Sequence, residues 1–244
     1  MKRINLSVVL ALVSLLIFPL GAKAQQDIGS IVGAEFNKSI GKKINLSVQE
    51  EWRTRENFGS PERFTTTVGL DYKLNTYLTA GAAYDRVNFH RTGSDNSTNT
   101  GWEKRDRWGV YLDGHIQRDK WLFSLRETYQ QTYTDGVVTR VTRNRINPLR
   151  VLRSRLEADY SMDKKWQPFA SLEAFNPLNN PSNNDTEKLR FQLGTNMRLS
   201  KHSNVKIYYR YDAFLDKHLE WKYDIENGSY DGRHYIGIKY SLSF

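Results

Sequence analysis

Apolar and polar residues alternate along most of this chain, and the last segment, residues 234–244, shows the pattern most clearly. Its apolar row consists of Ile236, Ile238, Tyr240, Leu242 and Phe244, and the residues between them are mainly polar. Successive side chains of a strand point to opposite faces, so this segment predicts a strand with one apolar and one polar face. The strand ends on an aromatic residue, Phe244, at the end of the chain.

The same period of two recurs along the body of the chain, and no segment shows a convincing helical period. Alternating segments cover residues 44–49, 63–74, 78–84, 107–116, 121–125, 152–160, 170–175, 189–199 and 205–212. A weaker segment that contains glycine covers residues 28–37. The pattern therefore predicts an all-β protein with about ten strands from residue 43 onward.

Three features favour a membrane barrel over a soluble barrel or sandwich, which would alternate in the same way. Many strands are long, and a tilted membrane strand needs about 9–11 residues. Short connections such as 118–120 alternate with long ones such as 134–148. Aromatic residues flank the short connections, namely Tyr72, Tyr77, Trp121, Tyr160 and Trp166. We therefore predict an antiparallel transmembrane β-barrel of about 10–12 strands with the short connections in the periplasm, and we expect Phe244 to end its closing strand.

The first 24 residues have the pattern of a signal peptide. Lys2 and Arg3 precede an apolar run over residues 6–20, and Ala22-Lys23-Ala24 matches a small-x-small cleavage site. We expect cleavage near Ala24, which leaves residues 25–244 as one barrel domain. Together with the barrel pattern, this predicts the outer membrane of a Gram-negative bacterium.

Composition narrows the possible functions further. The mean hydropathy of −0.67 is too polar for a helical membrane protein, and the chain has no cysteine for a lipid anchor, a disulfide or a thiolate metal site. The formal charge is +9, but the basic residues are interleaved with 27 acidic ones, so we do not expect nucleic-acid binding. We also expect no metal and no cofactor.

Two details do not fit a simple barrel. A strand at 28–37 makes the strand number odd, and it could thread the lumen, lie across the barrel or pair as an odd member. Residues 219–225 also alternate and could belong to an extracellular hairpin. Glu50 and Glu127 fall in rows predicted to face lipid, which predicts a register-shifting bulge or, as the alternative, a contact between protomers.

The row predicted to face the lumen is strongly charged. Its members are Arg63, Asp71, Arg107, Asp113, Arg126, Arg153, Arg155, Glu157, Asp159, Glu173, Arg190, Arg198, Arg210 and Asp212. One interpretation is a charged pore that selects anions or acidic solutes. The other is a network of ion pairs that fills a narrow barrel. We favour a mainly filled polar lumen, in a protein that is structural or passes small solutes.

Several stretches give the chain a resemblance to a known family: residues 149–156, 166–175, 189–194, 208–211 and 234–244. The chain resembles an uncharacterised family of Gram-negative outer-membrane β-barrels that is defined by a domain of unknown function. The resemblance covers most of the chain after the signal peptide. It implies the fold and the location, and it brings no catalytic residues.

Two other functions stay open. The first alternative is a lipid-modifying barrel enzyme, in which His90, His218 and His234 could meet at the outer rim, although no spacing motif links them to a nucleophile. The second is a secreted soluble β-barrel that binds an apolar ligand inside.

The sequence also suggests partners. Arg140, Arg143 and Arg145 lie in a predicted outer loop, where guanidinium groups would suit the phosphates of lipopolysaccharide. We further expect contact with outer-membrane lipid, and recognition of the C-terminal strand by the barrel assembly machinery. The sequence gives no indication of the oligomeric state.

Overall fold

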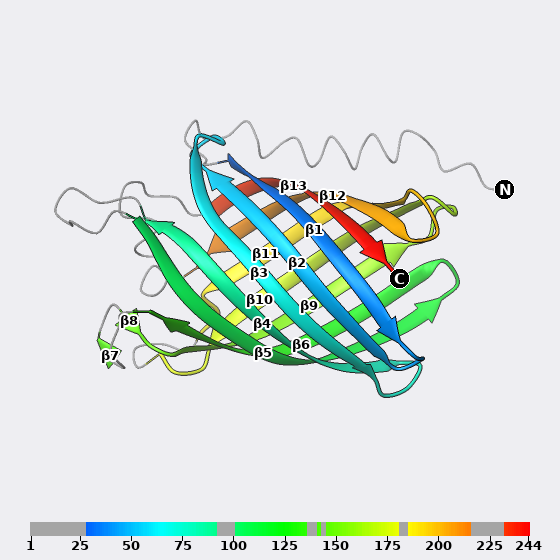
Figure 1. Cartoon of the computed structure of the whole chain (residues 1–244), viewed down its shortest axis with the longest axis horizontal. Coiled ribbons are helices and arrows are strands. Elements are labelled where there is room, and N and C mark those ends of the chain that lie inside the picture. The colour runs from blue at the N-terminus through cyan, green and yellow to red at the C-terminus, as the bar shows by residue number, and fades with distance from the viewer. Residues whose placement is uncertain (1–27, 92–100, 136–140, 143–144, 181–184, 216–231) are drawn as a thin grey trace.

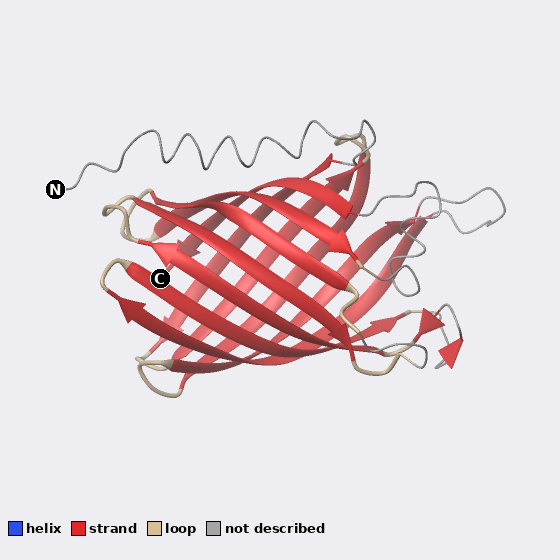
Figure 2. Cartoon of the chain, turned by 180° about the vertical axis from the view of Figure 1, so that it is seen from behind, coloured by secondary structure: helices blue, strands red, loops and turns tan. Residues whose placement is uncertain are grey.

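Eleven long strands close into one barrel in the computed structural model, which describes residues 28–91, 101–135, 141–142, 145–180, 185–215 and 232–244 (Figures 1 and 2). The strands are β1 (Ile28–Ile40), β2 (Ile44–Arg55), β3 (Ser60–Lys73), β4 (Leu78–Arg91), β5 (Gly101–Arg118), β6 (Trp121–Thr134), β9 (Leu149–Tyr160), β10 (Trp166–Pro177), β11 (Lys188–Arg198), β12 (Ser203–Phe214) and β13 (Gly232–Ser243). A separate ribbon pairs β7 (Val141–Thr142) with β8 (Arg145–Ile146). The prediction of an all-β barrel of about 10–12 strands is confirmed.

The barrel closes through a parallel pair of strands. β1 runs beside β13 from Ile28, opposite His234, to Asn37, opposite Ser243, and the two strands lie side by side in Figure 1. Every other neighbouring pair in the barrel is antiparallel. Of the three possibilities for the strand at 28–37, the structure therefore shows the odd member of the barrel wall. The hairpin considered for residues 219–225 lies outside the described residues.

The two ends of the barrel differ. At the end that we call the short-turn end, residues 41–43, 74–77, 119–120, 161–165 and 199–202 connect the strands. The opposite, long-loop end carries a tight turn at residues 56–59 and the longer connections that leave β4, β6, β10 and β12. Phe244 lies at the short-turn end, where its amide donates a hydrogen bond to the Asn37 carbonyl (3.0 Å). The terminal residue thus extends the β1–β13 seam.

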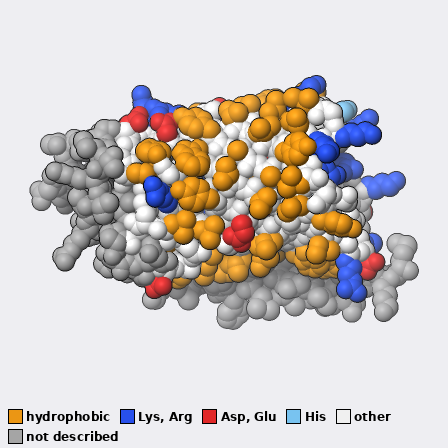
Figure 3. Space-filling view, turned by 90° about the horizontal axis from the view of Figure 1, so that it is seen from below, with side chains coloured by type: hydrophobic (Ala, Val, Ile, Leu, Met, Phe, Trp, Pro, Cys, Tyr) orange, Lys and Arg blue, Asp and Glu red, His pale blue; other side chains and the backbone are white. Residues whose placement is uncertain are grey.

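The outer wall of the barrel is apolar. Large side chains such as Val48, Val68, Leu112, Leu156 and Ile238 are 44–57% exposed on it. Figure 3 shows hydrophobic side chains as a broad band across one face, with Lys and Arg gathered at one end. Soluble monomers rarely expose a contiguous apolar surface of this extent. The wall therefore has the character of a surface that faces lipid.

Aromatic side chains border this band at both ends. At the short-turn end, Trp121 packs on Tyr160 with a centroid distance of 4.8 Å, and the Lys120 ammonium lies 6.0 Å from the Tyr160 ring. At the long-loop end, Trp52 lies 6.3 Å from Trp102. Amphipathic rings with nearby cations are typical of the two interfaces of a membrane barrel.

The structure corrects the predicted bulges at Glu50 and Glu127. Neither residue lies at a register shift, and both stay on the outer face. Each carboxylate instead accepts a hydrogen bond from the neighbouring strand, Glu50 from Thr66 (3.0 Å) and Glu127 from Ser154 (2.7 Å). A hydroxyl on the neighbouring strand thus lowers the free-energy cost of a carboxylate that faces lipid, and no bulge is needed to turn it inward. The register shift lies elsewhere, after Arg53.

Two inward tyrosines lie flat on the lumen wall because a glycine on the next strand leaves room for each ring. Tyr111 covers Gly81, and Tyr208 covers Gly237 beside the closing seam. A Cβ at either glycine would overlap the ring. Gly81 and Gly237, which have no side chain, therefore leave the space that these two rings occupy.

We expect Gly237→Ala to destabilise the barrel by about 1–3 kcal/mol, because the Tyr208 ring must leave its place on the wall. The measurement is urea unfolding of the barrel refolded in lipid vesicles, followed by tryptophan fluorescence. Gly114→Ala is the matched control, since the nearest atom to its new Cβ would be the Leu125 carbonyl oxygen at 3.9 Å. Equal midpoints for the two variants would contradict this account of Gly237.

Candidate functional site

The lumen contains a chamber of about 360 Å³ whose wall is strongly basic. Eleven of its lining residues are Lys or Arg: Arg53, Arg63, Arg107, Arg126, Arg153, Arg155, Lys188, Arg190, Lys206, Arg210 and Lys239. Three are acidic: Glu51, Asp85 and Glu187. Gln49, Gln130, Gln192 and Tyr208 add neutral hydrogen-bonding groups. The lining of the chamber is therefore polar and mainly basic, and many of its basic groups pair with carboxylates outside the lining.

A row of charged residues crosses the wall of the lumen on seven neighbouring strands, β5 to β13. Its members, which we call the charge ladder, are Asp113, Arg126, Arg155, Glu173, Arg190, Asp212 and Arg233, each opposite the next in the strand register. Side chains that are opposite one another on one face of a sheet lie close enough to interact. The register of the barrel thus brings together six of the residues predicted to face the lumen.

Ion pairs connect most of the ladder. Arg126 binds Asp113 (2.5 Å), and Arg190 bridges Glu173 (3.1 Å) and Asp212 (2.9 Å). Residues next to the ladder strengthen it, since Arg153 also binds Glu173 (2.6 Å) and Arg210 also binds Asp212 (2.5 Å). Each of these two buried carboxylates is therefore shared by two guanidinium groups.

The other predicted lumen residues also lie on the inner face, with different partners. Arg63 pairs with the fully buried Glu62, Arg107 with Asp85 (3.6 Å), and Glu157 with Lys206 (3.8 Å). Asp71 accepts hydrogen bonds from Tyr111 and from Asn45. Asp159 is buried, whereas Arg198 is exposed at the short-turn end.

Sequence reasoning missed several residues of the chamber. Lys206 and Lys239 belong to inward rows, so the alternation already contained the signal for them. Glu62 had no such signal, because the register shift after Arg53 places both Glu62 and Arg63 inside. Tyr235, 173 residues away in sequence, donates a hydrogen bond to Glu62 (2.9 Å).

A second cavity of about 390 Å³ lies at the short-turn end and shares two lining residues with the chamber, Lys206 and Lys239. Lys239 binds Glu35 across the closing seam (2.9 Å). The turn residue Asp163 also lines this cavity, and the backbone amides of Lys165 and Trp166 donate to its carboxylate (both 2.7 Å). These two amides lower the pKa of Asp163. The short-turn cavity is thus next to the chamber, with two lysines between them.

Exposed basic residues surround this end of the barrel. Ten lie in or next to the short turns: Lys38, Lys42, Lys43, Lys73, Arg118, Lys120, Lys164, Lys165, Arg198 and Lys201. The exposed acids in the same turns are Asp119 and Asp163. The rim, the short-turn cavity and the chamber therefore carry charge of the same sign.

Towards the long-loop end, apolar side chains also point into the barrel. Leu149, Val151 and Phe175 form a buried cluster that lines the chamber. The Lys188 ammonium lies 3.7 Å from the centre of the Phe175 ring, and the Arg105 guanidinium lies 4.5 Å from that of Phe89. Cation–π contacts of this kind hold basic groups in a partly apolar surrounding.

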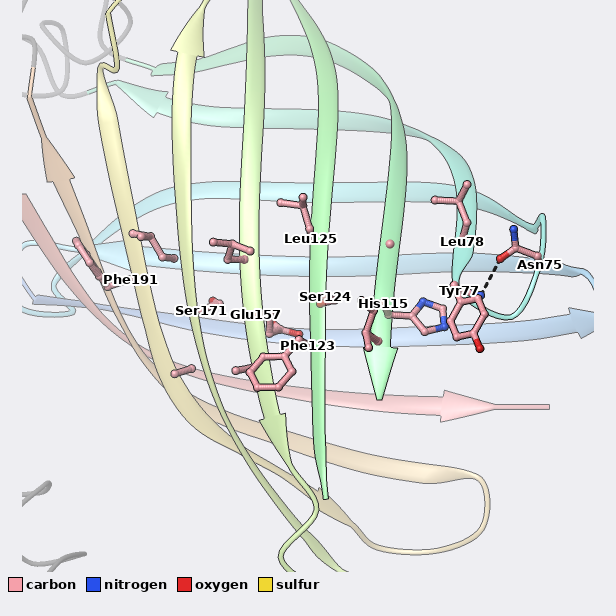
Figure 4. Close-up of a pocket in the computed structure, with 16 residues that line it drawn as sticks. Asn75, Tyr77, Leu78, His115, Phe123, Ser124, Leu125, Glu157, Ser171 and Phe191 are labelled. Carbon is pink, nitrogen blue, oxygen red and sulfur yellow. Dashed lines mark hydrogen bonds between the residues drawn. The ribbon is translucent and has the colours of Figure 1, made fainter. Parts of the chain in front are cut away.

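An apolar hollow of about 870 Å³ lies on the outer wall, across β4 to β11 (Figure 4). Small residues such as Gly114, Ala158 and Ala170 form part of it, and larger ones such as Phe123 and Leu125 surround them. Because this apolar hollow is outside and the chamber is polar, the geometry disagrees with a soluble barrel that binds an apolar ligand inside.

Two of the three histidines considered for catalysis, His90 and His234, do not lie together. His90 on β4 packs on Trp102 (5.1 Å), whereas His234 on β13 stacks on Tyr211 (4.7 Å), and β1, β2 and β3 separate the two strands. His218 lies outside the described residues. The part of the chain that the structure describes also holds no group of three or more His, Asp or Glu side chains arranged for a metal ion.

The loop arginines cannot be placed in the same way. Arg140 and Arg143 lie outside the described residues, and only the backbone of Arg145 is described, in β8. Residues 1–24, the predicted signal peptide, also lie outside them. Within the described ranges, no helix is long and apolar enough to span a bilayer.

The closed barrel, its apolar outer wall and its polar lumen define the fold of an outer-membrane β-barrel. The chain belongs to the family described as "Protein of unknown function (DUF2490)", whose model matches residues 32–222. The resemblance inferred from the sequence is thereby confirmed. No curated protein matches the chain significantly.

Solved structures show a distant likeness in fold. The NanC porin matches 77% of this chain and 87% of its own, with 11% identity and a TM-score of 0.47. The outer-membrane expressed OmpT of Vibrio cholerae matches 70% of this chain and 54% of its own, with 14% identity and a TM-score of 0.37. OmpT folded in vitro matches 79% and 88%, with 9% identity and a TM-score of 0.38.

Proposed function

We propose that this protein is an outer-membrane barrel of a Gram-negative bacterium that admits small anionic solutes to its lumen and passes them slowly. The observation that supports this most strongly is the lining of the chamber, where eleven basic residues face three acidic ones. Ion pairs with carboxylates outside the lining hold many of these basic side chains in place. The groups that a solute would meet are nevertheless mainly basic, which favours solutes of negative charge.

The size of the chamber limits the solute. A volume of about 360 Å³ lies at the low end of the range of small-molecule sites. Inward Arg and Lys side chains occupy much of the lumen, as expected for a barrel between the filled 8-stranded and the open 16-stranded forms. We therefore propose solutes no larger than a sugar acid and a low conductance.

The basic rim supports access from the short-turn end. A cleft lined by charge of one sign raises the local concentration of the opposite ion. Because the rim, the short-turn cavity and the chamber are all basic, an anion meets favourable potential along this route. We assign the short-turn end to the periplasm, as the pattern of connections predicts. This assignment also leaves β13 and Phe244 where the barrel assembly machinery would recognise them.

Proteoliposomes can test the proposed passage. With valinomycin present to carry potassium, vesicles that contain the refolded barrel should swell in potassium chloride and, more slowly, in potassium gluconate. Swelling in sorbitol should be slower still, because a neutral solute gains nothing from the basic wall. Vesicles that swell no faster than protein-free controls would contradict passage and leave a structural barrel.

A further inference from the structure

One basic side chain of the chamber has no direct ion-pair partner. Among the described residues, Arg155 on β9 forms no ion pair or hydrogen bond through its side chain, and its buried Nε has no acceptor. It stands in the middle of the charge ladder, between Arg126 on β6 and Glu173 on β10. The guanidinium nevertheless lines the chamber. A buried guanidinium nitrogen without an acceptor is unusual enough to need an explanation.

Three of the carboxylates near Arg155 are already engaged, and Asp159, four residues along β9, is buried. Asp113 binds Arg126, and Glu173 binds both Arg153 and Arg190. Glu157, two residues along β9, lies near the Lys206 ammonium. Arg126, Arg153 and Arg155 thus bring three guanidinium groups together on adjoining positions of two strands. Glu157 and Glu173 act on the third, Arg155, only through longer-range attraction.

We propose that Arg155, with Arg126, Arg153 and Lys206 around it, binds a compact oxyanion, the phosphate or carboxylate group of a small solute. A guanidinium presents its donors in a planar fork that matches such a group. The bound anion accepts hydrogen bonds from the part of the guanidinium that faces the chamber. The chamber has room for an attached group of up to about the size of a monosaccharide. The inference rests on the proposed entry of anions and names the place where they bind.

Titration calorimetry with inorganic phosphate, on the full-length barrel refolded in detergent, tests this site. We expect saturable binding to the wild type and an affinity that falls roughly ten- to a hundredfold in Arg155→Gln, the usual effect of losing a charged hydrogen bond. Arg198→Gln is the matched control, because this inward arginine lies at the short-turn end, outside the chamber lining. Its affinity should match that of the wild type.

Stability separates a binding role from a structural one. If the role of Arg155 is to bind a ligand, Arg155→Gln should be at least as stable as the wild type when phosphate is absent. In urea without phosphate, the variant should then unfold at the same or a higher concentration. Phosphate should raise the midpoint of the wild type and not that of the variant. A variant that unfolds earlier without phosphate and binds phosphate normally would overturn the proposal, as would a wild type that does not bind phosphate. Binding without passage into vesicles would instead retain the Arg155 site and refute the proposed function.

Discussion

Replacing Asp212 by Asn should lower the free energy of unfolding by about 3–5 kcal/mol, the usual cost of removing one partner from a buried ion pair. The Asp212 side chain is 4% exposed and accepts hydrogen bonds from both Arg190 and Arg210. An amide carries no charge and offers one acceptor oxygen. Both guanidinium groups would then be buried without their shared counterion. Urea unfolding in lipid vesicles measures the effect.

Glu157→Gln is the control for this prediction. Glu157 also faces the lumen, but its ion pair with Lys206 is long, at 3.8 Å, and its side chain is more exposed. We expect a loss below about 1 kcal/mol, as for partly solvated pairs. A loss at Asp212 no larger than that at Glu157 would mean that the ladder does not hold the strands together.

The second large effect is expected on the outer wall. Leu125 on β6 is 46% exposed and lies between the two aromatic borders. In a bilayer, Leu125→Arg should cost about 2–4 kcal/mol, the penalty for a basic residue that faces lipid near the midplane. On a soluble barrel, the same change would place an arginine in water at little cost. Folding yield and urea stability in phosphatidylcholine vesicles check the prediction.

Ser124→Arg is the matched control, since Ser124 is next in sequence and points into the lumen. It lies opposite Glu157 on β9, so the new guanidinium would meet a carboxylate. We expect near wild-type stability in vesicles. Equal losses at residues 124 and 125 would contradict the assignment of the two faces.

Much of the fold could be predicted from the sequence because alternation determines which face each side chain occupies. The rows through Leu112, Leu156 and Ile238 point outward as expected, and the charged rows point inward. What alternation cannot give is the register around the barrel. The charge ladder exists because residues 113, 126 and 155 lie opposite one another, and this depends on the lengths of the connections between β5, β6 and β9.

Other features depend on contacts between distant parts of the chain. The parallel seam joins β1 to β13, and no local pattern distinguishes this arrangement from a strand inside the lumen. Alternation predicts a bulge at Glu50 and Glu127 because each strand shows only its own carboxylate, whereas the compensating hydroxyls of Thr66 and Ser154 belong to other strands. The lack of a direct ion-pair partner for Arg155 likewise depends on how residues of other strands pair with one another.

The sign of the reversal potential across a potassium chloride gradient tests the central claim most directly. A single barrel in a planar bilayer should give small current steps. Their reversal potential should be shifted from zero towards the equilibrium potential of chloride, because the chamber wall is basic. Lys206→Glu combined with Lys239→Glu should shift the reversal potential towards the equilibrium potential of potassium. A wild-type reversal potential on the potassium side, or no current steps at all, would contradict an anion-selective lumen.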